Sequence, residues 1–214
     1  MVTEQDGLRE RKKRATREAL REAALRLAVE HGPNNVRVDD IAEAAGVSPR
    51  TYNNYFASRE QAIVAAVTAE REARVAAAVA ARPPDVRLAD AVVDAIVEQY
   101  TDPGERGRDV LLLITDSPTL RDAFVGTAAE IEQPLAVAIS ARLPDADEQS
   151  ARVLAASVAA AVRIGLQRWL PSATGAGGLV VVSGSLPDLL RTALEPLVPA
   201  LDAAQDRPPR RRHR

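Results

Sequence analysis

The hydrophobic residues near the start of the chain recur three and four positions apart, which is the spacing of one face of an α-helix. This series consists of Leu20, Ala23, Ala24, Leu27 and Ala28. Thr16 precedes it as the expected N-cap, and Gly32 with Pro33 should end the helix. The pattern therefore predicts a first helix over residues 16–31.

Three more helices are predicted directly afterwards. The second follows from the same spacing in Val38, Ile41, Ala42 and Ala45, before Gly46. Ser48-Pro49 is typical of the N-cap and first turn of a third helix. That helix must be short, because Ser58-Arg59-Glu60-Gln61 matches the capping box that opens a fourth. We expect the fourth helix to continue without a break to about Ala81.

The later periodic segments predict five further helices and no convincing sheet. They lie over residues 88–100, 110–114, 120–139, 154–169 and 186–201. We therefore expect an all-α chain of about nine helices. An N-terminal three-helix module should precede a larger helical bundle, and the paired prolines at 83–84 should separate the two.

The composition excludes several classes of function. The 214 residues contain no cysteine and two histidines, so disulfides, thiolate chemistry and multi-histidine metal sites are not expected. A helical enzyme would need an acid/base constellation, and none with persuasive spacing is present. We therefore expect no catalytic residues, no metal, no cofactor and no enzyme activity. No apolar run approaches the roughly 18 residues of a membrane helix, and the N-terminus lacks the pattern of a signal peptide, which favours a cytoplasmic protein.

The formal net charge of −2 conceals an uneven distribution. Residues 8–37 contain nine Lys or Arg against four Asp or Glu, whereas residues 61–206 contain 12 against 20. The last eight residues, RPPRRRHR, carry five arginines and no acid. A local basic cluster is the electrostatic feature expected of a nucleic-acid-binding protein. A basic arm over residues 1–13 could lie along or in a DNA groove, or could serve only as a solubilising terminus.

Residues 38–56, VDDIAEAAGVSPRTYNNYF, have the features of a helix-turn-helix. Gly46 supplies the tight turn, and Tyr52 and Phe56, four residues apart, can both face inward. The opposite face then carries Arg, Asn and Asn side chains, which can bond guanine and adenine edges, while a Tyr and an Arg flank it for phosphates. The predicted DNA contacts are Arg37, Ser48, Arg50, Thr51, Asn53, Asn54, Tyr55 and Arg59. The alternative is a helical subdomain that uses this motif only for packing.

Residues 14–67 resemble the DNA-binding module of TetR-family transcriptional regulators. The resemblance rests on Ile41-Ala42, Ala45-Gly46-Val47-Ser48, Tyr55-Phe56 and Ser58-Arg59-Glu60. It implies a homodimeric, ligand-responsive protein that binds a DNA operator and is usually a repressor. Arg37 stands where the family commonly has Thr, and Asn53 where it often has Tyr. These departures leave open a helical ligand-binding or interaction protein that no longer reads an operator.

The resemblance also implies a division of labour along the chain. We expect a basic flexible arm over 1–13, the helix-turn-helix module over 14–57, a linking helix over 58–82, a ligand-binding and dimerisation domain over 83–206, and a basic disordered tail over 207–214. Effector binding would move the linking helix and so change the spacing of the two recognition helices.

The predicted effector site combines aromatic residues with a few polar groups. Its candidates are Tyr100, Arg121, Phe124, Arg163, Gln167 and Trp169. The alternative for each aromatic is ordinary core, which is the commoner role of such residues. The segments 117–120 and 138–142 are similar to the branch related to mycofactocin regulators, whose ligand domain is described as acyl-CoA-like binding. That similarity implies an acyl-CoA or another hydrophobic anion as effector.

Small residues in the helix over 147–170 predict a close helix contact. They are Ala155, Ala156, Ala159 and Ala160. By the family pattern, this helix and the final one, over 186–201, would form a four-helix dimer interface. The alternative is a tight contact within one chain.

Overall fold

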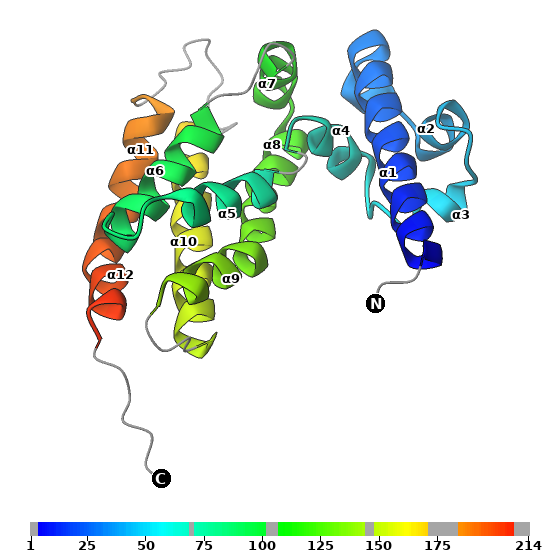
Figure 1. Ribbon diagram of the computed structural model, residues 1–214. Helices are drawn as coiled ribbons and strands as arrows, with labels where there is room; N and C mark the ends of the chain where they lie inside the picture. Colours follow the sequence, from blue (N-terminus) through cyan, green and yellow to red (C-terminus); the bar gives the residue numbers. More distant parts are fainter. Residues whose placement is uncertain (1–3, 69–70, 102–106, 144–147, 171–183, 208–214) are drawn as a thin grey trace. The chain divides into compact units, whose positions relative to one another are not determined.

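The computed structural model describes residues 4–68, 71–101, 107–143, 148–170 and 184–207, and these residues form helices without strands (Figure 1). The α-helices are α1 (Glu4–His31), α2 (Val38–Ala44), α3 (Pro49–Tyr52), α4 (Arg59–Thr68), α5 (Arg71–Ala81), α6 (Leu88–Thr101), α7 (Gly107–Asp116), α8 (Pro118–Gly126), α9 (Glu132–Arg142), α10 (Glu148–Trp169), α11 (Leu186–Leu194) and α12 (Val198–Gln205). Three short 3-10 helices accompany them: η1 (Pro33–Asn35), η2 (Thr127–Ile131) and η3 (Glu195–Leu197).

The predicted all-α fold is confirmed. Over the described residues, three pairs of helices correspond to single helices in the sequence pattern: α4 with α5, α8 with α9, and α11 with α12. Counted in that way, the helices number nine, as the hydrophobic spacing predicts.

The chain divides into two compact units. The first consists of Met1–Ala69 and Gly104–Phe124, and the second of Glu70–Pro103 and Val125–Arg214. The segment containing α7 belongs to the first unit because α7 packs against α1 and α4. The polypeptide therefore passes between the units three times. The boundary expected at residues 82–83 does not coincide with this division.

Two predictions about the N-terminal region are corrected by the structure. Helix α1 begins at Glu4, so Thr16 is not its N-cap and residues 4–13 are helical instead of forming a flexible arm. These residues contain no proline and are mostly good helix formers. Once packing around Leu20 has nucleated the helix, extending it toward the N-terminus adds one hydrogen bond per residue.

The linking helix predicted over 58–82 corresponds to α4 and α5, and residues 69–70 between them lie outside the described residues. Of the tail predicted over 207–214, only Arg207 is described.

In the first unit, α1 packs along α4 and against α2, which in turn packs on α3. The core consists of fully buried apolar side chains from all four helices. They include Leu20, Ala24, Ile41, Tyr52 and Ile63. The helix-turn-helix is thereby held on a rigid support.

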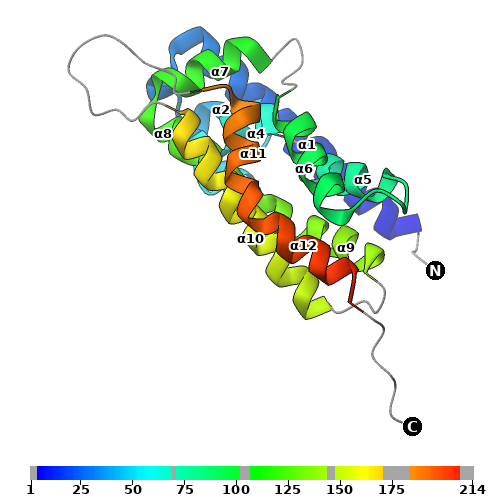
Figure 2. The ribbon, with the colours of Figure 1, turned by 90° about the vertical axis from the view of Figure 1, so that its left-hand side faces the viewer.

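In the second unit, α10 lies between α9 and α11, and α5 packs against α6 and α9 (Figures 1 and 2). Arg142, the last residue of α9, fastens the connection between α5 and α6. Its Nη1 donates to the carbonyl oxygens of Val79 at 3.3 Å and Arg82 at 2.7 Å. Its Nη2 donates to those of Pro83 at 3.2 Å and Val86 at 2.8 Å. One side chain thus satisfies four carbonyls at the end of α5 and in the loop that follows.

Candidate DNA-binding site

The turn between α2 and α3 depends on Gly46, whose φ of 69° lies in the left-handed region that favours glycine. The N–H of Gly46 donates to the carbonyl oxygen of Glu43 at 3.0 Å, and that of Val47 to Ala42 at 2.9 Å. These bonds end α2 in the manner of a glycine C-cap. The chain then reverses within two residues into α3, as the sequence predicts.

Ser48 caps α3, which confirms its predicted structural role. Its Oγ accepts a hydrogen bond of 3.1 Å from the backbone N–H of Thr51 and lies 2.9 Å from the Thr51 hydroxyl. Pro49 occupies the first helical turn, where its missing N–H costs nothing. The two hydroxyl groups are therefore linked to each other at the exposed start of residues 48–56, which we call the recognition segment.

Tyr52 and Phe56 anchor the recognition segment through its buried side. Both are buried, and their ring centroids lie 5.9 Å apart. The Tyr52 hydroxyl donates a 2.8 Å hydrogen bond to the carbonyl oxygen of Ser58, at the start of α4. Burial, followed by the nearby Glu60 carboxylate, raises the pKa of Tyr52 to about 12. The phenol therefore remains protonated and able to donate at neutral pH.

The regular helix α3 ends at Tyr52, but the next three residues continue its helical path and its exposed polar surface. Asn53 is the C-cap with helical φ and ψ. The N–H groups of Asn54 and Tyr55 donate back to the carbonyl oxygens of Thr51 and Tyr52, at 3.1 and 2.8 Å. Residues 53–55 thus extend the segment by a turn.

Most of the predicted DNA contacts are accessible on this module. Arg37, Ser48, Arg50, Asn53 and Asn54 are exposed, and Thr51 and Tyr55 are half-buried. Arg37 is the N-cap residue of α2 and provides no side-chain cap. Its guanidinium is therefore not used in starting that helix.

Arg59 is half-buried, and most of its donors bond groups within the module. Its Nη1 donates to the carbonyl oxygens of Asn34 at 3.0 Å and Val36 at 2.7 Å, and its Nε donates to Glu60 at 2.8 Å. These bonds tie the start of α4 to the connection between α1 and α2. They leave Nη2 as the group for the phosphate contact, which stays a prediction.

Half of the capping box predicted at the start of α4 is present. The Ser58 hydroxyl accepts from the N–H of Gln61 at 3.2 Å. The Gln61 side chain accepts from the N–H of Ala57 at 3.0 Å, one residue before the N-cap, and not from that of Ser58. The two bonds hold the segment around Ser58, whose carbonyl oxygen receives the Tyr52 hydroxyl.

Arg17 on α1 is a further residue of this module that the motif does not reveal. Its guanidinium lies over the ring of Phe56, 5.3 Å from the centroid. An attraction between a cation and an aromatic face links α1 to the end of the recognition segment. The signal available in the sequence is the spacing of Arg17 from Leu20, Ala24 and Ala28, which places it on the helix face that is buried further along α1.

The six candidate effector residues are distributed over both units. Arg121 and Phe124 lie on α8, and Arg121 donates to the carbonyl oxygen of Thr115 at 2.9 Å. In the second unit Tyr100 is buried, Trp169 is half-buried, and Arg163 and Gln167 are exposed. Their assignment to one site stays a prediction.

Tyr100 has a partner that the sequence patterns do not single out. The Arg71 guanidinium lies over its ring, 4.4 Å from the centroid, and Arg71 is only 8% exposed. Burial lowers the pKa of Arg71 and raises that of Tyr100 to about 12. A sequence signal for the burial of Arg71 exists, because Arg71 is spaced four and eight residues from the buried Val75 and Val79 and so shares their helix face. The second unit thus contains an internal cation stacked on an aromatic ring.

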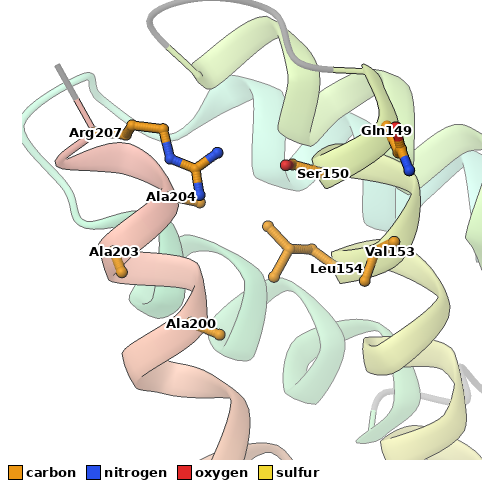
Figure 3. Close-up of a pocket in the computed structure, with 8 residues that line it drawn as sticks. All are labelled: Gln149, Ser150, Val153, Leu154, Ala200, Ala203, Ala204 and Arg207. Carbon is orange, nitrogen blue, oxygen red and sulfur yellow. The ribbon is translucent and has the colours of Figure 1, made fainter. Parts of the chain in front are cut away.

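Two surface grooves lie in the second unit. One, of about 420 Å³, lies between the start of α10 and α12 and is lined by Gln149, Ser150, Val153, Leu154, Ala200, Ala203, Ala204 and Arg207 (Figure 3). The other, of about 380 Å³, lies between α9 and α10 and includes Val137 and Arg152. Neither is lined by any of the six candidate effector residues.

A glycine-turned helix-turn-helix with an exposed polar recognition segment, built into a helical chain, defines the class of DNA-binding transcriptional regulators. No helix within the described ranges is long and apolar enough to cross a membrane.

Comparisons with known proteins place the chain within that class. The family model for bacterial regulatory proteins of the tetR family matches residues 20–66. The chain is 31% identical over 200 residues to the HTH-type transcriptional regulator TcmR of Streptomyces glaucescens, covering 88% of each protein. It is 40% identical over 76 residues to the HTH-type transcriptional regulator BetI of Rhizobium meliloti (strain 1021), covering 34% of this chain and 37% of BetI.

The chain therefore belongs to the TetR family and is a DNA-binding transcriptional regulator. Regulators of this family bind DNA operators and act as dimers, and in general they are not enzymes.

Proposed function

We propose that this protein is a dimeric repressor that leaves its operator when a small molecule binds to the second unit. The observation that carries the proposal is the recognition segment, in which Tyr52 and Phe56 are buried while Arg50, Asn53 and Asn54 remain exposed. This division provides a rigid base and a polar reading face on one short segment.

Each exposed side chain has a proposed role on DNA. Arg50 can bond the O6 and N7 of a guanine, and Asn53 or Asn54 the N6 and N7 of an adenine. Ser48, Thr51 and Tyr55 border this face with hydroxyl groups suited to phosphates. Arg37, at the start of α2, and the remaining donor of Arg59 would add positive charge beside them.

Dimer formation is proposed through the outer face of α10. Of its four small residues, Ala155 and Ala159 are buried within the chain, whereas Ala156 is exposed and Ala160 half-buried. The buried pair makes a tight contact within the chain, and the other two alanines are accessible for the proposed dimer contact.

The outer face of α10 is also apolar. Val153 and Ile164, at 60% and 48% exposure, lie on it with Ala156 and Ala160. Large apolar side chains exposed in a row along a helix are typical of a surface that a partner covers. A second copy of α10, with α11, would complete a four-helix interface.

Release by an effector requires that binding in the second unit changes the first. Dimeric helix-turn-helix proteins read half-sites about 34–36 Å apart, so a small change in the spacing of the recognition segments weakens binding. Three chain connections join the units, after Ala69, before Gly104 and after Phe124. We propose that α7 and α8 transmit the change together with α4 and α5.

The effector proposed is a hydrophobic anion of the acyl-CoA type. The buried Arg71 on Tyr100 supports this, because a cation inside an apolar bundle suits a ligand with an acidic group. Tyr100 and Trp169, with the candidates Arg163 and Gln167, lie in the same unit.

Selection from a pool of random duplexes, followed by fluorescence anisotropy of the selected duplex against a scrambled one, tests the proposal. We expect selective binding with a steep salt dependence, because neutralised phosphates release counterions. Long-chain acyl-CoA should then release the selected duplex. Failure to enrich any sequence would show that operator reading has been lost.

A further inference from the structure

The N-terminal half of α1 carries a row of exposed basic side chains that lie outside the recognition segment. Arg9, Lys13 and Arg17 are exposed and follow one another at four-residue spacing. Side chains at this spacing lie on the same face of a helix. Figure 1 shows the N-terminal turns of α1 extending past α3. The row therefore lies on an ordered helix and extends the polar surface of the helix-turn-helix module.

This row is the extension of the packed face of α1. Further along the helix, Leu20, Ala24 and Ala28 continue the same face and are fully buried. At Arg17 the face reaches its boundary, where the guanidinium covers the Phe56 ring at 5.3 Å. From Arg17 toward the N-terminus the same face is basic. The basic row thus begins directly beside Phe56, at the end of the recognition segment.

Arg9 and Lys13 do not stabilise the chain on their own. Like charges four residues apart destabilise a helix. Arg9 and Lys13 form no ion pair with any residue in the described part of the chain. A polyanion laid along the row would remove this repulsion.

We propose that Arg9 and Lys13, presented by helical α1, bind the phosphate backbone of the duplex next to the bases read by α3. This inference rests on the proposed function and adds a second, sequence-independent contact to it. Arg17, stacked on Phe56, positions the row. Because the contact comes from one face of a rigid helix, the direction of the side chains matters and not only their charge.

The test compares two double variants of the full-length protein. R9A/K13A removes the row, whereas R11A/R14A removes two positive charges from the other side of the same turns, since each residue turns the helix by about 100°. The two pairs match in charge and nearly in helix propensity. Each is measured on the selected duplex and on scrambled DNA across a salt series.

We expect R9A/K13A to weaken binding to both duplexes by the same factor. The salt slope should fall by about 0.9 for each lost phosphate contact, or about 3.6 for the four contacts of a dimer. R11A/R14A should change the slope by less than half as much. Circular dichroism confirms that both variants remain helical.

A third variant, Ala15→Pro, retains every charge but interrupts α1 between Lys13 and Arg17. Because the core face starts at Leu20, the module should stay folded. We expect it to lose nearly as much affinity as R9A/K13A. A flexible basic arm would not be affected by this change.

Two results would overturn the inference while leaving the proposed function intact: equal slopes for the two double variants, or a loss confined to the selected duplex. If the unmodified protein does not distinguish the selected duplex from scrambled DNA, the proposed function fails and this inference fails with it.

Discussion

The hydroxyl of Tyr52 donates a 2.8 Å hydrogen bond to the carbonyl oxygen of Ser58. This bond joins the buried side of the recognition segment to the first turn of α4. The Ser58 hydroxyl is itself held by the N–H of Gln61. The orientation of the exposed residues between them is therefore set from the buried side of the recognition segment.

Arg50→Ala tests direct reading of a base. Because a bidentate contact to guanine would be lost, binding to the selected duplex should weaken by about 1–3 kcal/mol, with little change on scrambled DNA. Anisotropy at one fixed salt concentration measures both. Equal losses on the two duplexes would assign Arg50 to the backbone.

Arg59→Ala distinguishes an internal role from a phosphate contact. The variant removes bonds to the carbonyl oxygens of Asn34 and Val36, so the free energy of unfolding should fall by about 1.5–3 kcal/mol. If the role is purely internal, the salt slope of DNA binding stays unchanged. A decrease in slope of about 0.9 per site would show that Nη2 also holds a phosphate.

The buried tyrosines predict a loss of stability at high pH. The pKa of Tyr52 and that of Tyr100 are each raised from 10.0 to about 12, by burial first. Between pH 10 and pH 12 the unfolded chain loses these protons while the folded chain keeps them, so stability falls as pH rises. Below pH 10 both states are protonated and the contribution is complete.

Denaturant titrations of the Y52F and Y100F variants across that pH range measure this effect. Each substitution should flatten part of the decline, and the Y52F/Y100F double variant most of it. A decline of the same steepness in the double variant would assign it to other groups.

Arg142→Met tests the contacts at the end of α5. Four carbonyl oxygens lose a charged donor while the apolar stem is largely retained, so we expect a loss of about 2–3 kcal/mol in unfolding free energy. Arg191→Met, an exposed arginine on α11, is the matched control and should remain within about 0.5 kcal/mol. Chemical denaturation followed by circular dichroism compares them.

Ile164→Glu should disrupt the proposed dimer, because it places a charge in the apolar row on the outer face of α10. Sedimentation velocity should show monomers at concentrations where the unmodified protein is dimeric. Val137→Glu is the control, since Val137 is similarly exposed at 67% but lies on α9. If both variants remain dimeric, the interface lies elsewhere.

The DNA-binding module is the part that the sequence predicts best. The Gly46 turn, the Ser48 cap, the inward-facing Tyr52 and the Ser58 cap of α4 all occur as expected. Each depends on hydrogen bonds or side-chain spacing within five residues. Local chemistry of that range can be evaluated from neighbouring residues alone.

The start of α1 shows where pattern analysis ends. The residues before Thr16 lack an apolar face, so hydrophobic periodicity carries no signal for them. Their helix follows from propensity and from extension of a helix that is already packed. The basic residues predicted to form a flexible arm are therefore helical, and the helix fixes the direction in which each side chain points.

The sequence by itself determined most of the helices, the helix-turn-helix and the exposed polar residues of the recognition segment, because these depend on contacts within a turn or two of helix. Only the tertiary structure decided three other features. It turned the Arg59 donors onto carbonyls 23 and 25 residues away, buried Arg71 against Tyr100, and grouped α7 with α1 and α4. These contacts join residues far apart in the chain, and their free energy depends on packing that no local spacing specifies.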